Sequence, residues 1–221
     1  MKIGMILLAA GYGRRFGSNK LFYEIDGQPM YLRVLNQLIQ AKKKLRGNKK
    51  ENENKENNEE NNKENNRVSL EQAPKLEIAV VTQYQEIEET VKSKGVTVLI
   101  NHHPEQGISS SLKTGLEYFK DTDACLFAVA DQPWLTSGAV AGLVRLFLKS
   151  GKGIACVSKG NQPGNPCIFA SKYYPELMTL TGDRGGKKVL KQHLEDTAFF
   201  EVTDERELED VDFQPRPESS D

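Results

Sequence analysis

The stretch that decides the fold is residues 1–20, Met-Lys-Ile-Gly-Met-Ile-Leu-Leu-Ala-Ala-Gly-Tyr-Gly-Arg-Arg-Phe-Gly-Ser-Asn-Lys. The apolar run at 3–8 predicts a buried strand, which leads directly into a turn with Gly11, Gly13 and Gly17. Glycine lets the backbone adopt positive φ and approach a ligand closely. Successive free N–H groups in such a turn form a concave site for an anion. The stretch therefore predicts a strand that ends in an anion-binding loop.

Basic side chains accompany this glycine-rich loop at Arg14, Arg15 and Lys20. Their charge favours a polyphosphate as the anion. The loop lacks the P-loop pattern G-x-x-x-x-G-K-[ST], and its glycine spacing differs from the dinucleotide fingerprint G-x-G-x-x-G. On spacing alone, a tight strand-to-helix turn with solvated basic residues is the alternative.

The chain of 221 residues has the size of one α/β domain, which we place at residues 1–215. Its net charge of −1 gives no electrostatic reason to bind nucleic acid or a membrane surface. No apolar run approaches the roughly 20 residues of a membrane span, and residues 1–10 have the pattern of a buried strand rather than of a signal peptide.

The cysteines, Cys125, Cys156 and Cys167, are few and widely spaced. This spacing argues against a disulfide framework or a C-x-x-C metal site. We expect buried thiols that act as small hydrophobic side chains, and a reducing, cytoplasmic location.

Composition changes abruptly after the first predicted helix. Residues 47–66 consist only of Gly, Asn, Lys and Glu. A segment without apolar side chains cannot offset the entropy cost of ordering it. We therefore expect a disordered insertion at about residues 46–70, and favour a solvated linker over a partner-binding role.

Outside the insertion, the apolar pattern alternates between the periods of strand and helix. Strands are predicted at 3–8, 76–82, 96–100, 124–130 and 154–158, and helices at 30–43, 84–94, 108–119 and 136–149. This alternation predicts an α/β protein of three αβα layers, with a mostly parallel sheet and helices on both faces. Ligands of such sheets bind at the carboxyl ends of the strands.

Carboxylates occur where such a site forms. Asp131 directly follows the apolar run at 124–130, and Mg²⁺ is typically held by one or two carboxylates together with substrate phosphates. Asp210 and Asp212 lie two residues apart, so on an extended segment they face the same side. A turn-forming Asp and a solvated acidic tail are the alternatives.

A third motif is residues 101–112, Asn-His-His-Pro-Glu-Gln-Gly-Ile-Ser-Ser-Ser-Leu. It places Ser109 and Ser110 at the start of a predicted helix, where N–H and hydroxyl groups hold an anion or cap the helix itself. The adjacent histidines point in different directions, so we do not assign them a metal.

Taken whole, Leu8-Ala-Ala-Gly-Tyr-Gly-Arg-Arg-Phe-Gly-Ser-Asn-Lys20 resembles the start of the molybdenum-cofactor nucleotidyltransferases, L-A-[AG]-G-x-[GS]-x-R-[MF]-G-x-x-K. The Ala9-Ala10-Gly11 form is similar to the cytidylyltransferase branch, because the guanylyltransferase branch usually has A-G-G. Later motifs resemble the family in the same order: residues 101–112, Asp131-Gln132-Pro133, Gly164-Asn165-Pro166, 181–186 and 208–212. The resemblance covers residues 3–212 except the insertion.

This resemblance implies a Rossmann-like fold of the nucleotide-diphospho-sugar transferase type. It also implies transfer of CMP from CTP to molybdopterin, with release of pyrophosphate. The implied catalytic residues are Arg15, Lys20 and Asp131, and the implied ligands of Mg²⁺, or of Mn²⁺, are Asp131 and Asp212. The implied nucleotide-binding residues are Leu8, Ala9, Ala10, Gly11, Gly13, Arg14, Arg15, Lys20, Asn101, Ser109, Ser110 and Asp131. The implied pterin-side residues are Gly164, Asn165, Asp183 and Arg184.

Other functions stay open beside this one. GTP or a sugar phosphate as substrate is disfavoured by Ala10 and by Asn19, which stands where sugar nucleotidyltransferases normally have Pro. A non-catalytic chaperone that holds the cofactor for a molybdenum hydroxylase has no need for the Asp131 and Asp212 pair. If the protein is instead the enzyme, a molybdenum hydroxylase is also its expected partner.

Overall fold

The computed structural model describes residues 1–11, 19–53, 73–160 and 162–211. Within them a seven-stranded sheet has the order β5-β4-β1-β6-β8-β7-β9. Its strands are β1 (Lys2–Ala9), β4 (Lys75–Thr82), β5 (Thr97–Ile100), β6 (Ala124–Val129), β7 (Ile154–Lys159), β8 (Gln162–Ala170) and β9 (Thr197–Glu201). Only β8 runs antiparallel to its neighbours among these described strands, so the sheet is mostly parallel, as predicted.

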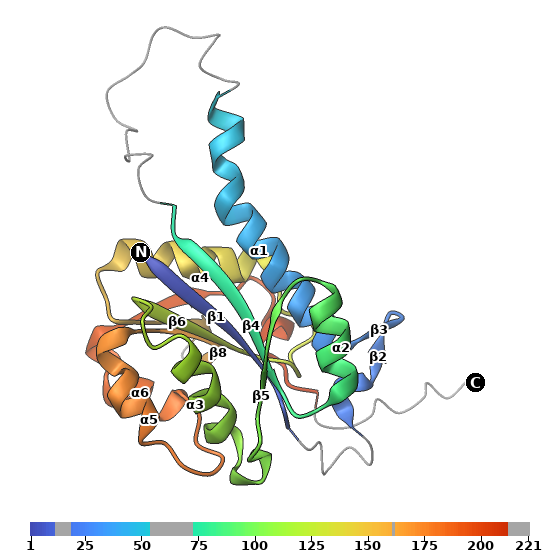
Figure 1. Cartoon of the computed structure of the whole chain (residues 1–221). Coiled ribbons are helices and arrows are strands. Elements are labelled where there is room, and N and C mark those ends of the chain that lie inside the picture. The colour runs from blue at the N-terminus through green and yellow to red at the C-terminus, as the bar shows by residue number, and fades with distance from the viewer. Residues whose placement is uncertain (12–18, 54–72, 161, 212–221) are drawn as a thin grey trace, which may run out of the picture.

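Helices cover both faces of this sheet (Figure 1). One face packs against α1 (Met30–Glu53), α2 (Gln85–Ser93) and α4 (Ser137–Ser150). The other packs against α3 (Ile108–Tyr118), α5 (Tyr174–Met178) and α6 (Lys187–Gln192). The three-layer αβα architecture is therefore confirmed.

The central strand β1 shows why the chain begins with an unbroken apolar run. Met5 and Leu7 pack into the core on the α1 side, whereas Ile6 and Leu8 pack into the core on the α3 side. Successive side chains of a strand point to opposite faces. Because helices cover both faces, every position of this strand favours an apolar residue.

Helix α1 begins at Met30, where expected, but continues beyond residue 43 to Glu53. The start of the segment expected to be disordered is therefore helical. Lys and Glu have good helix propensity, and adding residues to a packed helix is easier than nucleating one. The rest of that segment, from residue 54 onward, lies outside the described residues.

Helix α4 begins as its sequence predicts. The Thr136 hydroxyl accepts a hydrogen bond from the Ala139 N–H at 3.1 Å, which caps the first turn. Strand β8 was not predicted, because Gly164 and Pro166 interrupt the apolar pattern of a strand. No helix in the described ranges combines the length and apolarity that crossing a membrane requires.

Candidate active site

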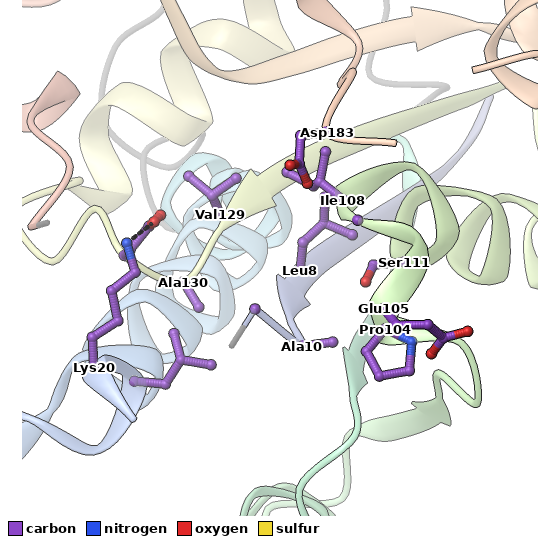
Figure 2. A pocket seen from close by; sticks show the side chains of 14 residues that line it. Leu8, Ala10, Lys20, Pro104, Glu105, Ile108, Ser111, Val129, Ala130 and Asp183 are labelled. Atoms are coloured by element: carbon purple, nitrogen blue, oxygen red, sulfur yellow. Dashed lines mark hydrogen bonds and ion pairs between the residues drawn. The ribbon is translucent and has the colours of Figure 1, made fainter. Parts of the chain in front are cut away.

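A cavity of about 310 Å³ opens at the carboxyl ends of β1 and β6, the edge where such sheets bind ligands. Figure 2 shows Lys20 and Ala130 on one side, Leu8 and Ala10 in the middle, and Glu105, Pro104 and Ser111 on the other side. Its lining residues are Leu8, Ala10, Gly11, Lys20, Leu21, Pro104, Glu105, Gly107, Ile108, Ser111, Val129, Ala130, Asp131 and Asp183.

An ion pair joins two of the predicted catalytic residues on one wall of this cavity. Lys20 Nζ lies 2.7 Å from Asp131 Oδ2, although the two residues are 111 positions apart in the chain. Lys20 belongs to a 3₁₀ turn, η1 (Lys20–Phe22), whose first turn is capped by the Asn19 side chain. The side chains are only 14% and 24% exposed, so solvent screens their attraction less than at the surface.

The described end of the chain is fastened to the loop that carries Asp131. The Val211 N–H donates to the Asp131 carbonyl at 3.0 Å. The Gln132 side-chain amide donates to Asp210 Oδ1 at 2.8 Å and to the Leu208 carbonyl at 3.1 Å. Residues 208–211 of the acidic terminal motif therefore lie against the loop that carries Asp131. Asp212 lies outside the described residues.

The opposite wall is formed by a second 3₁₀ turn, η2 (Pro104–Gln106), and by the start of α3. Gly107 joins them with φ at 80°, and a Cβ there would lie 2.5 Å from Asp183 Oδ1. The Ser109 N–H donates to the Gly182 carbonyl at 3.1 Å. The turn between α5 and α6 is thereby held against α3, which brings Asp183 to the cavity.

Asn101 supports this wall from inside the protein. The residue is 3% exposed, and its side-chain amide donates to the Ser110 and Ser111 hydroxyls at 2.8 and 2.9 Å. Its oxygen accepts from the His103 N–H at 2.9 Å. Asn101 makes these bonds and is not among the residues that line the cavity. Its contact with a nucleotide stays a prediction.

The other predicted residues divide between the cavity and its surroundings. Leu8, Ala10 and Gly11 line it, whereas Ala9 is buried in the core. Ser109 and Ser110 border a neighbouring hollow of about 360 Å³, and it is Ser111 that lines the cavity beside Lys20 and Asp131. Gly13, Arg14 and Arg15 lie outside the described residues.

The predicted pterin-side residues are not brought together around the cavity. Asp183 lines it, but the adjacent Arg184 is exposed and does not. Gly164 and Asn165 lie on β8, where a Cβ on Gly164 would be 2.5 Å from the Leu208 side chain. Gly164 therefore allows β8 to pack against the segment before Asp210.

Pro104, Glu105 and Ile108 line the cavity and were missed as site residues. Pro104 and Glu105 follow β5, so they lie beyond the carboxyl end of a strand, as Asp131 does. Their position directly after a predicted strand was the sequence signal that could have identified them as site residues. The thiol of Cys167 takes no part: contact with Cys156 and burial raise its pKa well above the usual value, so it stays protonated.

The oxygen donors of the cavity suit a hard divalent cation. Among the described residues, no three His, Cys, Asp or Glu side chains gather into a ready-made metal cage. Mg²⁺ commonly uses one or two carboxylates and completes its shell with water and phosphate oxygens. Asp131, which is partly exposed and faces the cavity, fits that mode of binding.

Solved structures of other proteins show to which class of fold the chain belongs. A nucleotidyl transferase from Methanothermobacter thermautotroptrophicus has 20% identity and a TM-score of 0.69, covering 96% of this chain and 92% of that chain. Rv0371c from Mycobacterium tuberculosis H37Rv in complex with manganese has 15% identity and a TM-score of 0.60, covering 91% and 89%. The molybdopterin-guanine dinucleotide biosynthesis protein A from Archaeoglobus fulgidus has 15% identity and a TM-score of 0.53, covering 90% and 83%. The fold is the Rossmann-like fold of nucleotide-diphospho-sugar transferases.

The family follows from the sequence. The family model of the MobA-like NTP transferase domain matches residues 5–197, and the chain belongs to this family. It is therefore a nucleotidyltransferase. Comparison with the curated proteins gives no match.

Proposed function

We propose that the protein transfers CMP from CTP to the phosphate of molybdopterin and releases pyrophosphate. The observation that carries this proposal is the Lys20–Asp131 ion pair beside the start of the glycine-rich loop. It combines a cation for phosphate oxygens with a carboxylate for a hard metal, at the edge of the sheet where ligands bind. The likeness to a molybdopterin-guanine dinucleotide biosynthesis protein supports a pterin acceptor.

In this reaction an acceptor phosphate oxygen bonds to the α-phosphorus of CTP, and the bond from that phosphorus to the bridging oxygen breaks. Pyrophosphate leaves with the electron pair. The acceptor phosphate is already ionised at neutral pH, so no general base is required. Such transfers depend mainly on positioning and charge neutralisation.

The chain's residues supply both. Lys20 contacts the α-phosphate, and the loop from Gly11 through Gly13 holds the β- and γ-phosphates. Arg15 neutralises charge that develops on pyrophosphate, and Arg14 adds to the positive field. Asp131 and Asp212 would hold Mg²⁺, or Mn²⁺, which when bound neutralises phosphate charge and polarises the α-phosphorus.

The base and the acceptor are assigned to different residues of the cavity. Ala10 lines it, and the Ala9-Ala10-Gly11 sequence favours CTP over GTP. Asp183 is the pterin-side residue that faces the cavity, so we assign acceptor contacts to it before Gly164, Asn165 and Arg184. A molybdenum hydroxylase is the proposed recipient of the product.

The direct test incubates the purified protein with Mg²⁺, molybdopterin and either CTP or GTP, and measures pyrophosphate release. We expect release with CTP and little with GTP. Release with GTP alone would move the protein to the guanylyl branch. A folded protein that is inactive with both but binds molybdopterin would be the non-catalytic chaperone.

Two variants test the metal assignment in the same assay. Asp212→Asn removes the proposed second ligand, and we expect turnover to fall about 100-fold or more, because the metal loses one of two carboxylates. Asp210→Asn is the matched control, since Asp210 bonds to Gln132 and keeps an oxygen acceptor as Asn. Equal activity in both variants would contradict the role of Asp212.

A further inference from the structure

Two side chains that follow β4 hold the backbone at the start of the glycine-rich loop. The Gln83 amide donates to the Ala10 carbonyl at 2.7 Å, and the Tyr84 hydroxyl donates to the Gly11 carbonyl at 2.9 Å. Gln83 also donates to the Tyr84 hydroxyl at 3.3 Å. The two contacts therefore form one connected group on the β4 side of β1.

The bond to the Ala10 carbonyl fixes which way the Gly11 N–H points. A trans peptide is planar, so its carbonyl and the following N–H point in opposite directions. When the Ala10 carbonyl faces Gln83, the Gly11 N–H faces away from β4. Ala10 and Gly11 line the cavity together with residues of β1, β6, α3 and the turns η1 and η2, whereas Gln83 and Tyr84 are not among its lining residues. The two side chains therefore hold these carbonyls from outside the cavity.

Tyr84 also touches the far end of the loop. Its ring packs edge-on against Phe22, with the centroids 5.9 Å apart, and Phe22 belongs to the same 3₁₀ turn as Lys20. Phe22 in turn packs against Tyr31 of α1 at 5.8 Å. One side chain thus contacts Gly11 before the loop and the Lys20 turn after it. The Tyr84 N–H is itself fixed by the Thr82 hydroxyl at 3.1 Å.

We propose that Gln83 and Tyr84 are positioning residues that hold the Ala10–Gly11 peptide groups with an N–H aimed at the phosphates of the bound nucleotide. The inference rests on the proposed function, because it assigns the phosphates to this cavity. The two residues act through the backbone and do not touch the reacting atoms. Their effect therefore belongs to nucleotide affinity rather than to the chemical step.

The test uses Tyr84→Phe, which removes the hydroxyl and keeps the ring against Phe22, and Gln83→Glu, which turns the donor toward Ala10 into an acceptor. We expect Tyr84→Phe to weaken CTP–Mg²⁺ binding about fivefold and Gln83→Glu about tenfold or more. The KM for CTP rises in parallel, whereas kcat, the KM for molybdopterin and Tm stay close to wild type. The matched control is Tyr118→Phe, which removes a hydroxyl bonded to Glu77 outside the cavity.

The outcomes separate this inference from the proposed function. Wild-type affinity for CTP in both variants would overturn the positioning role alone. A loss of CTP affinity that is accompanied by a clear fall in Tm in the same variant would also overturn it, because the contacts would then stabilise the fold as a whole. Wild-type protein that binds neither CTP nor GTP would overturn the proposed function and this inference with it.

Discussion

At the scale of single residues, the site is organised by charge compensation between Lys20 and Asp131. Each side chain is mostly withdrawn from water, and each is the other's partner at 2.7 Å. A partly buried charge is costly when its partner is removed. The same two groups, a cation and a hard carboxylate, are the ones that a metal-bound phosphate requires. The contact therefore keeps both charges ordered at the edge of the cavity.

The prediction at this scale concerns Lys20→Ala. We expect kcat/KM for pyrophosphate release to fall about 100-fold or more, because a preorganised cation is lost where negative charge develops. Folding should survive, as judged by a cooperative thermal transition. Lys92→Ala is the matched control, since it breaks an exposed ion pair with Glu88 on the outer surface of α2. Activity near wild type in Lys20→Ala would contradict its catalytic role.

At the scale of elements, the far wall depends on how the start of α3 meets the turn between α5 and α6. Gly107 lies at the contact with φ at 80° and ψ at −171°, a conformation that is essentially limited to glycine, and has no room for a side chain. The buried side chain of Asn101 donates hydrogen bonds to Ser110 and Ser111 of the same helix. The helix start is therefore held from two directions, and Ser111 and Asp183 face the cavity as a result.

Replacing Gly107 with Ala tests this packing. We expect a fall in Tm and in turnover, because the new Cβ meets Asp183 and the Gly182 backbone within 3 Å. Gly95→Ala is the control: Gly95 has φ at 67° but no neighbour within 4 Å, so the variant also places alanine at a positive φ but without the collision. The comparison uses thermal melts and the pyrophosphate assay. Equal effects in the two variants would show that the contact does not position the wall.

At the scale of the whole molecule, the cavity lies at one end of the sheet, and α1 ends and β4 begins at the other end. Figure 1 shows α1 starting near the carboxyl ends of the strands and extending past the amino ends of β1 and β4. Within the described residues, one sheet carries the apolar cores on both faces. One domain over residues 1–215 stays a prediction. The described residues that flank the Asn-, Lys- and Glu-rich segment therefore lie at the end away from the cavity.

We expect deletion of residues 47–66 to leave turnover and Tm close to wild type. Arg46 of α1 and Glu77 of β4 line one surface hollow, so residues 67–74 suffice to connect them, at up to about 3.3 Å each. The entropy cost of closing a loop also depends only weakly on the number of residues in it. A Gly/Ser segment of equal length is the control. Lost activity with an unchanged Tm would assign the insertion a functional role.

The sequence by itself determined the layers of the fold and the first wall of the site. Strand and helix periods are local, and Asp131 directly follows a buried strand, so its place at the carboxyl edge could be predicted. Lys20 could be predicted for the same reason, because it ends the loop after β1. These features depend on neighbours along the chain.

Only the tertiary structure decided which side chains meet at the cavity. The serine run predicted a helix start, but the rotation of α3 gives the cavity Ser111 rather than Ser109 or Ser110. Asn101 is turned inward, and Tyr84 reaches back to a loop on another strand. Such contacts depend on how distant segments pack, because packing sets the rotation of each element, and no local pattern records that rotation.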